Sequence, residues 1–192
     1  MENNFNIEEM IEKFGNKFDA KFIEQRKVFL WGAVHDESAK QVVNRLLYLE
    51  ATDPGKEITF YINSPGGVVT SGLVIIDAMK MISSPIKTVC MGMCASMGAM
   101  LLSQGEKGKR EMWSYGRVMI HQPSIGGAYG QASDLEITAK QMQKTKEILA
   151  TMLADSCNKS FDTIMKDFDR DFWMDANESL EYGIVDSISK KV

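Results

Sequence analysis

The sequence predicts a single α/β domain with a largely parallel sheet. From Val28 onward, short apolar runs alternate with amphipathic stretches, and this alternation is typical of strands that are followed by helices. The 192 residues are enough for one domain with its own core, and a hydrophobic content of 44% is typical of a globular chain. Three cysteines without CxxC spacing and only two histidines predict neither a disulfide framework nor a zinc site.

Charge and hydropathy restrict the expected partners and compartment. The net charge is −4 and the basic residues are dispersed, whereas a nucleic-acid surface needs them clustered on one face. No apolar run reaches the roughly 18 residues of a membrane span, and the N-terminus lacks the apolar region of a signal peptide. We therefore expect a cytoplasmic chain that begins near Met1, contacts no nucleic acid or membrane, and acts on peptides or small molecules.

Residues 1–25 are predicted to form an N-terminal arm ahead of a single domain of residues 26–192. The arm is polar and charged, but its apolar side chains have roughly helical spacing, at Phe5, Ile7, Met10, Ile11 and Phe14. We expect a short amphipathic helix or an arm that a partner orders. A mobile terminus is the alternative.

Hydrophobic periodicity predicts the elements of the first half. Three apolar runs predict strands at 28–34, 58–63 and 86–92, and two amphipathic stretches predict helices at 36–51 and 70–82. His35 precedes the sequence Asp-Glu-Ser, which looks like the start of a helix. We therefore interpret His35 as a surface or capping residue.

A glycine-rich loop, residues 63–67 with the sequence NSPGG, follows the second predicted strand. Two successive glycines let backbone N–H groups come close to a ligand. The GxGxxG and GxxxxGK[ST] patterns of nucleotide-binding proteins are absent, so nucleotide binding is not expected. A plain tight turn is the alternative.

The segment of residues 91–100, MGMCASMGAM, places one hydroxyl, that of Ser96, in a run of small and apolar residues. Gly98 suits a tight passage from strand to helix, and the N–H of Met97 would lie near the hydroxyl. Several serine hydrolases place their nucleophile at such a turn, where N–H groups at the start of a helix stabilise an acyl oxyanion. A close-packed helix start is the alternative.

His121 follows a predicted buried strand, Val118–Ile120, and Pro123 ends that strand. Sites are built at strand ends in α/β sheets, and acyl transfer by a serine needs a base such as histidine. A carboxylate must then orient the imidazole. The tail offers several candidates, and the residues by themselves leave the choice open among Asp167, Asp169, Asp171, Asp175 and Asp186.

The longest predicted helix runs from a capping box at Ser133 and Glu136 to about Cys157. At about 1.5 Å per residue it approaches about 40 Å, and a domain of this size is scarcely that wide. Part of the helix should therefore project and bury its apolar stripe against another copy, which predicts a homo-oligomer. The alternative is a surface helix packed wholly on its own sheet. The tail should add a short helix, a helix that opens at Asp175, and a last strand, GIVDSI.

Six segments, in their order and spacing, resemble the ClpP peptidase family: YINSPGG, GMCASMGA, RVMIHQP, GQASDLEI, DRDFWM and EYGIVDSI. The resemblance covers about residues 28–190. The resemblance implies a ClpP/crotonase-like α/β fold with a projecting handle helix, the handle lying at about residues 123–158.

The resemblance also implies a serine-type endopeptidase with a defined set of site residues. Ser96 would be the nucleophile, His121 the general base and Asp171 the orienting carboxylate. The backbone N–H groups of Gly67 and Met97 would form the oxyanion hole.

The same resemblance implies an assembly and a partner. Two stacked heptameric rings, a tetradecamer, would enclose the sites in a barrel, with Arg170 in the ring–ring contact. A hexameric AAA+ unfoldase would thread polypeptides into it, as part of protein quality control. This chain has no Walker motif, so ATP would be the partner's ligand, and no cofactor or metal is expected.

The sequence departs from the family pattern in three places. The N-terminal segment differs from the family's axial loops, which bears on pore gating. The sequence WSYG at 113–116 replaces a Leu-Pro-Asn-like run in a strand of the unfoldase docking pocket, for which Tyr61, Met91 and Trp113 are the candidate residues. The segment 124–128 is one residue longer than usual beside the substrate-binding strand.

Three functions compete at this point. The first is a self-compartmentalised serine endopeptidase. The second is a structural or regulatory subunit with low activity until a related subunit joins it. The third is an acyl-CoA hydratase or isomerase, because such enzymes share the fold and bind a thioester carbonyl in a backbone oxyanion hole, although they usually work through carboxylates.

Overall fold

The computed structural model describes residues 17–127 and 129–189, and within them the chain forms one sheet with helices packed against it. The sheet contains the strands β1 Lys27–Trp31, β2 Ile58–Ser64, β3 Ile86–Ala95, β4 Arg110–Trp113, β5 Arg117–Ile120, β6 Phe172–Met174 and β7 Ser187–Ser189. The order β1-β2-β3-β4-β7 is parallel throughout, and β5 pairs in parallel with β3. Only β6 is antiparallel, to β5. The prediction of an α/β fold with a largely parallel sheet is confirmed.

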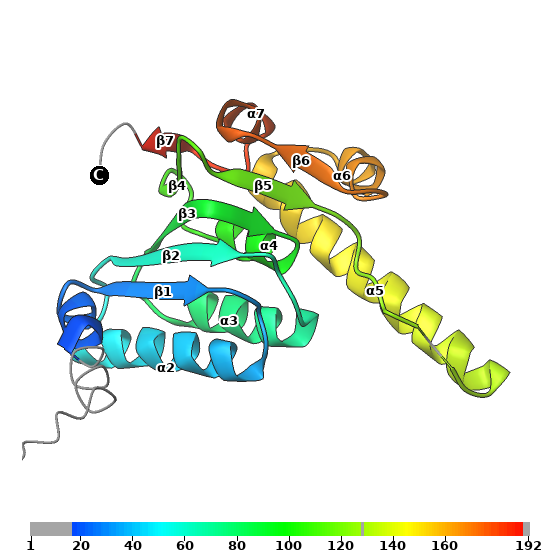
Figure 1. The fold of residues 1–192 in the computed structure, drawn as a ribbon, viewed down its shortest axis with the longest axis horizontal. Coiled ribbons are helices and arrows are strands. Elements are labelled where there is room, and N and C mark those ends of the chain that lie inside the picture. Colours follow the sequence, from blue (N-terminus) through cyan, green and yellow to red (C-terminus); the bar gives the residue numbers. More distant parts are fainter. Residues whose placement is uncertain (1–16, 128, 190–192) are drawn as a thin grey trace, which may run out of the picture.

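Helices pack against this sheet, mostly on one face. They are α2 Asp36–Thr52, α3 Val69–Met81, α4 Met97–Ser103, α5 Ala132–Cys157, α6 Phe161–Asp167 and α7 Ala176–Tyr182. Figure 1 shows α2 and α3 beneath β1 and β2, with α4 behind β3. Alternate strand residues such as Val28, Leu30 and Phe60 are buried against these helices, as a period of two requires. Across residues 17–127 and 129–189, no helix has both the length and the apolar character needed to span a membrane.

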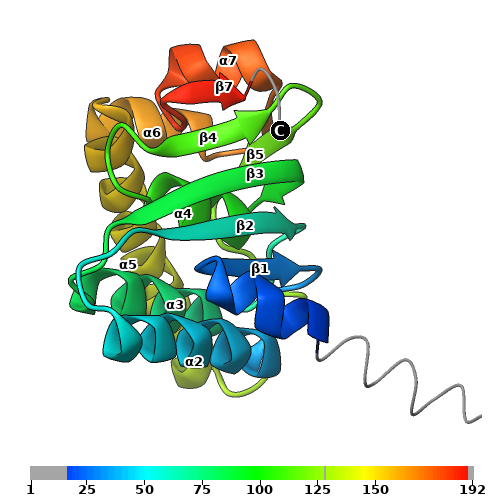
Figure 2. The ribbon, with the colours of Figure 1, turned by 90° about the vertical axis from the view of Figure 1, so that its left-hand side faces the viewer.

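Aromatic side chains line part of the other face. Phe29 stacks on Tyr61 with ring centroids 4.9 Å apart, and Phe22 lies 4.7 Å from Phe29. Phe22 belongs to a helix of residues 17–24, which Figure 2 shows beside β1. The rest of the predicted arm, residues 1–16, lies outside the described residues.

The sheet branches at β3, and this branch creates the site. Thr88, Val89 and Cys90 pair with β4, whereas residues 93–95 pair with β5. Gly92 lies between the two sets with a φ of 72°, a conformation that favours glycine. The register with β2 also shifts between Ile62 and Ser64. The end of β3 is thereby aligned with the end of β5, so Ser96 and His121 follow neighbouring parallel strands.

Helix α5 projects from the domain, as predicted. Its 26 residues extend about 39 Å, and its buried residues all lie in its C-terminal part, from Leu149 to Cys157. Figure 1 shows the N-terminal half running away from the sheet. Leu135, Ile137 and Ile148 are 37%, 59% and 52% exposed, so the projecting part carries uncovered apolar side chains.

The predicted capping box at the start of this helix is wrong. The helix begins at Ala132, its N-cap is Gln131, and that side chain makes no capping hydrogen bond. The N–H groups of Asp134 and Leu135 donate to the Gln131 carbonyl, so Ser133 already lies inside the first turn.

Two other predicted helix starts are confirmed. His35 caps α2: the Ser38 N–H donates to His35 Nδ1, and the Ser38 hydroxyl accepts from the His35 N–H. Asp175 and Glu178 form a reciprocal box at the start of α7. The last strand is shorter than predicted, because the helix ends in a left-handed Gly183 and the ladder with β4 starts only at Ser187.

Candidate active site

Ser96 occupies a strained turn between β3 and α4. Its φ is 54° and its ψ is −121°, a backbone conformation that residues with a Cβ seldom adopt. The Ser96 N–H donates to the Met119 carbonyl over 2.8 Å, which anchors the turn to β5. A Cβ on Gly98 would lie 2.9 Å from the Ser64 carbonyl oxygen, so the predicted close approach after the serine is confirmed. The serine therefore stands at a sharp strand-to-helix turn, as the nucleophilic serines of α/β-hydrolases do.

His121 lies between Ser96 and Asp171. Its Nε2 is 2.9 Å from Ser96 Oγ, and its Nδ1 is 3.2 Å from Asp171 Oδ1. Since a carboxylate can only accept, Nδ1 carries the proton and Nε2 is the atom able to accept from the serine hydroxyl. This is the hydrogen-bond order that an activated serine needs.

Three of the other four tail aspartates are engaged elsewhere, and Asp169 is exposed beside Arg170. Asp167 accepts from the Tyr182 hydroxyl over 2.9 Å, and Asp186 pairs with Arg110, with 2.6 Å between Asp186 Oδ1 and Arg110 Nη2. Asp175 caps α7. Of the five candidates that the residues left open, the fold brings Asp171 to the histidine.

The glycine loop packs directly on the Ser96 turn. A Cβ on Gly66 would lie 2.6 Å from Ser96 Cβ and 3.0 Å from the Met97 nitrogen. The loop is fixed from the other side by Val34, whose N–H donates to the Gly66 carbonyl and whose carbonyl accepts from the Val68 N–H, both over 2.8 Å. Outside the regular hydrogen bonds of helices and strands, no backbone hydrogen bond of the described residues has the Gly67 or the Met97 N–H as its donor. Both N–H groups are therefore candidates for binding a ligand oxygen.

Two cavities flank this arrangement. A narrow apolar slot of about 10 Å³ adjoins Ser96 and His121, and its other lining residues are Val69, Met97, Met100, Ile120, Pro123, Leu149 and Phe168. An open, polar cavity of about 500 Å³ lies on the far side of His121, lined by Gln122, Ser124, Asp169, Arg170 and Asp171. The serine thus faces an apolar slot, whereas the carboxylate faces solvent.

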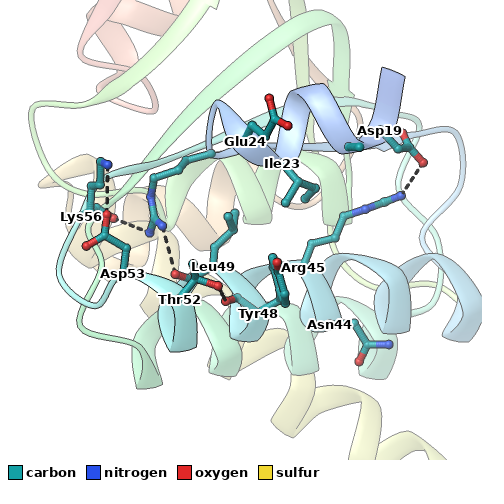
Figure 3. Close-up of a pocket in the computed structure, with 12 residues that line it drawn as sticks. Asp19, Ile23, Glu24, Asn44, Arg45, Tyr48, Leu49, Thr52, Asp53 and Lys56 are labelled. Carbon is teal, nitrogen blue, oxygen red and sulfur yellow. Dashed lines mark hydrogen bonds and ion pairs between the residues drawn. The ribbon is translucent and has the colours of Figure 1, made fainter. Parts of the chain in front are cut away.

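A larger cavity lies away from the serine. It has a volume of about 810 Å³ between the helix of residues 17–24 and α2 (Figure 3). Its polar groups are largely satisfied: Arg45 pairs with Asp19 at 3.2 Å, and the Arg26 guanidinium donates to the carbonyls of Leu49, Lys56 and Glu57. The chemistry of the Ser96 cluster, and not cavity size, therefore identifies the site.

Two of the three cysteine thiols are poorly suited to act as nucleophiles. Burial, and then the neighbouring Cys90, raise the pKa of Cys94 well above its ordinary value. Burial likewise raises the pKa of Cys157 to about 11. Both thiols stay protonated near neutral pH, and a protonated thiol is a poor nucleophile. The described part of the chain contains no cluster of His, Cys, Asp or Glu able to hold a metal ion.

The remaining predicted site residues lie apart from the serine. Arg170 is exposed, and its side chain reaches only to Asp169, at 3.9 Å. Tyr61, Met91 and Trp113 come from the neighbouring strands β2, β3 and β4; Met91 is buried, whereas Tyr61 and Trp113 are half-buried.

Two residues that support the site were not predicted from the sequence. Val34 holds the glycine loop, and Gln122 hydrogen-bonds the segment that carries Asp171. Gln122 had one available signal, because it directly follows the candidate base His121. Val34 had none beyond its place at the end of a predicted strand.

The sequence of this chain is similar to that of a known protein family. The family model described as Clp protease matches residues 12–192. The chain is 50% identical over 169 residues to the ATP-dependent Clp protease proteolytic subunits of two strains of Bacteroides fragilis and of Bacteroides thetaiotaomicron. The alignments cover 88% of this chain and 81%, 76% and 76% of those relatives, respectively.

Proposed function

Because this chain belongs to the Clp protease family, we propose that it is a serine endopeptidase in which Ser96, His121 and Asp171 cleave peptide bonds through an acyl-enzyme. The observation that carries the proposal is the position of His121, 2.9 Å from the serine oxygen and 3.2 Å from the carboxylate. Family membership favours this reading over an acyl-CoA hydratase or isomerase.

In the acylation step, Ser96 Oγ attacks the carbonyl carbon of the substrate while His121 Nε2 takes the hydroxyl proton. The carbonyl oxygen becomes an oxyanion that accepts from the N–H groups of Gly67 and Met97. Each such donor typically contributes about 10²–10³ in rate. The C–N bond then breaks, His121 returns its proton to the leaving amine, and the acyl group remains on Ser96.

Deacylation repeats the sequence with water as the nucleophile. His121 takes a proton from water, the hydroxide attacks the acyl carbon, and the Ser96 oxygen leaves with the proton from His121 Nε2. Throughout, Asp171 accepts from Nδ1–H, which keeps the imidazole in the required tautomer and stabilises its charged form.

The apolar lining of the slot beside Ser96 supports a preference for an apolar side chain before the scissile bond, once the slot widens to admit one. Met97 and Met100 line it, and methionine side chains adapt to irregular shapes. Burial of an apolar group there contributes roughly 25 cal/mol per Å² of surface removed from water.

Assembly into two stacked heptameric rings is part of the proposal. The exposed apolar side chains Leu135, Ile137 and Ile148 of α5 support burial against another copy, because a projecting helix gains little from such residues in water. Arg170, which is 94% exposed at its side chain, is available for a contact between rings.

Delivery of substrate by a hexameric AAA+ unfoldase completes the proposal. The relatives carry "ATP-dependent" in their names, whereas this sequence has no Walker motif. The unfoldase would therefore be the subunit that binds and hydrolyses ATP. Tyr61 and Trp113 are the accessible candidates for docking, with Met91 packed between their strands. The compartment would be the cytoplasm, and the role protein quality control.

A second candidate is a subunit with low activity until a related subunit joins it. The observation that favours it is the volume of the slot, about 10 Å³, which is too small for a substrate side chain. In that case a partner subunit would open the slot.

The test is hydrolysis of short fluorogenic peptides by the purified chain and by Ser96→Ala. Loss of the nucleophile should lower kcat by more than roughly 10⁴-fold. Ser114→Ala, at an exposed serine, is the matched control and should behave as the wild type. Retained cleavage by Ser96→Ala would refute the assignment, and full activity of the chain alone would refute the second candidate.

A further inference from the structure

The Asp171 side chain has few contacts that would hold its carboxylate in place. Its side chain is 61% exposed, and His121 is the one hydrogen-bond partner that it has among the described residues. It belongs to a short irregular segment, residues 168–171, between α6 and β6. The position of the carboxylate therefore depends on how the backbone of this segment is held.

Both ends of the segment are fixed. Phe168 is 1% exposed, and its carbonyl accepts from the Gln122 N–H over 2.7 Å. At the other end, Phe172 pairs with Ile120 in the antiparallel ladder of β5 and β6. Fixing the two ends does not by itself fix the backbone conformation of residues 169–171, on which the orientation of Asp171 toward the imidazole depends.

Gln122 supplies the contact in the middle. Its side-chain amide Nε2 donates to the Asp169 carbonyl over 3.0 Å. Arg170 offers no comparable anchor, since its side chain is 94% exposed and lies 3.9 Å from its own neighbour Asp169. Among the described residues, Gln122 is the one residue outside this segment whose side chain donates to its backbone.

The contact closes a small ring. Gln122 directly follows His121, and its amide reaches a carbonyl two residues before Asp171. The ring runs from His121 through Gln122 to Asp169, along the chain to Asp171, and back to His121 Nδ1. We propose that Gln122 is a positioning residue, whose side-chain amide holds the Asp169 carbonyl and thereby places the Asp171 carboxylate against His121.

This inference rests on the proposed peptidase function and assigns Gln122 no contact with substrate. Gln122→Met keeps the length of the side chain and removes the donor. Displacement of a catalytic group by about 1 Å costs up to roughly 10²-fold, so reactivity of Ser96 should fall about ten- to hundredfold. Loss of the carboxylate itself costs roughly 10⁴-fold. The effect should appear in kcat, with KM changed less than about twofold, because substrate contacts are intact.

The experiment measures the rate at which a fluorophosphonate labels Ser96 in a double-mutant cycle of Gln122→Met and Asp171→Ala. If Gln122 acts through Asp171, Gln122→Met should lower the labelling rate by less than about twofold in the Asp171→Ala background. Gln41→Met, at an exposed glutamine of α2, is the matched control and should label as the wild type. Sedimentation and thermal unfolding check that each variant is folded and assembled.

Two results would overturn the inference while leaving the peptidase assignment standing: wild-type labelling of Gln122→Met, or an undiminished effect in the Asp171→Ala background. Absence of labelling in the wild type would instead overturn the proposed function and the inference with it. If Gln122→Met fails to fold, Gln122→Glu serves the same purpose, because an ionised carboxylate of the same shape cannot donate to the Asp169 carbonyl.

Discussion

Gly66 approaches the Ser96 turn more closely than any side chain would allow. Gly66→Ala places a Cβ 2.6 Å from Ser96 Cβ, and the φ of 93° adds strain. The loop must shift, and the Gly67 N–H with it, so kcat/KM for a fluorogenic peptide should fall by roughly 10²-fold or more.

Gly55→Ala is the matched control for that substitution. Gly55 has a φ of 77°, but nothing lies within 4 Å of its Cβ position. Both variants should lose roughly 1–2 kcal/mol of folding free energy to backbone strain, and Gly66→Ala should lose more through its contact with Ser96. Gly55→Ala should nevertheless keep its activity. Equal activity of the two variants would contradict the placement of the Gly67 N–H.

Among the single residues of the site, Ser96 and His121 could be predicted from their local sequence context, whereas Asp171 could not be selected. Fifty residues separate Asp171 from His121, and their contact depends on the antiparallel pairing of β5 and β6. The choice came from family resemblance. Gln122 was missed because its side-chain amide donates to the backbone carbonyl of Asp169, and a bond to backbone does not depend on the identity of the partner residue.

Glu50 joins two elements, α2 and the turn after α3. Its carboxylate accepts from the N–H and hydroxyl groups of Ser83 and Ser84 over 2.5–3.0 Å. Hydrogen bonds from Ser83, and then from Ser84, lower the pKa of Glu50 to about 2, against an ordinary 4.5.

The pH dependence of stability follows from that shift. A carboxyl group whose pKa is lowered in the folded state stabilises the fold above its unfolded pKa, and this contribution disappears as the pH falls through the folded value. Glu50→Gln should therefore be less stable than the wild type at pH 7, with a difference that shrinks between about pH 4.5 and 2. Urea unfolding at several pH values measures this, with Glu37→Gln as an exposed control on the same helix. A difference that is constant with pH would contradict it.

The elements themselves were largely predictable. Alternation and amphipathic period gave the strands and helices around β1 to β3, because buried faces impose a hydrophobic period of two or 3.6 residues. The predicted start of α5 was wrong, since Ser133 matches a capping pattern while the N-cap lies two residues earlier, at Gln131. The branch of β3 at Gly92 was not predicted, because pairing with two strands in succession is a tertiary feature.

The projecting half of α5 leads to a prediction about assembly of the whole molecule. Ile137 is 59% exposed, so Ile137→Asp should leave the thermal unfolding of the isolated subunit nearly unchanged. In the assembly it would bury an unpaired charge, which costs several kcal/mol. Sedimentation velocity should therefore show smaller particles for Ile137→Asp than for the wild type. Identical sedimentation of the two would contradict a role for this face in assembly.

An activated serine that this chain assembles by itself should react with a serine-directed probe. The most direct measurement is intact-mass analysis after treatment with a fluorophosphonate, with the modified peptide mapped and Ser96→Ala treated in parallel. We expect one added label per chain, confined to Ser96, and none on Ser96→Ala. Labelling at another residue, or a wild-type chain that takes up no label, would contradict it.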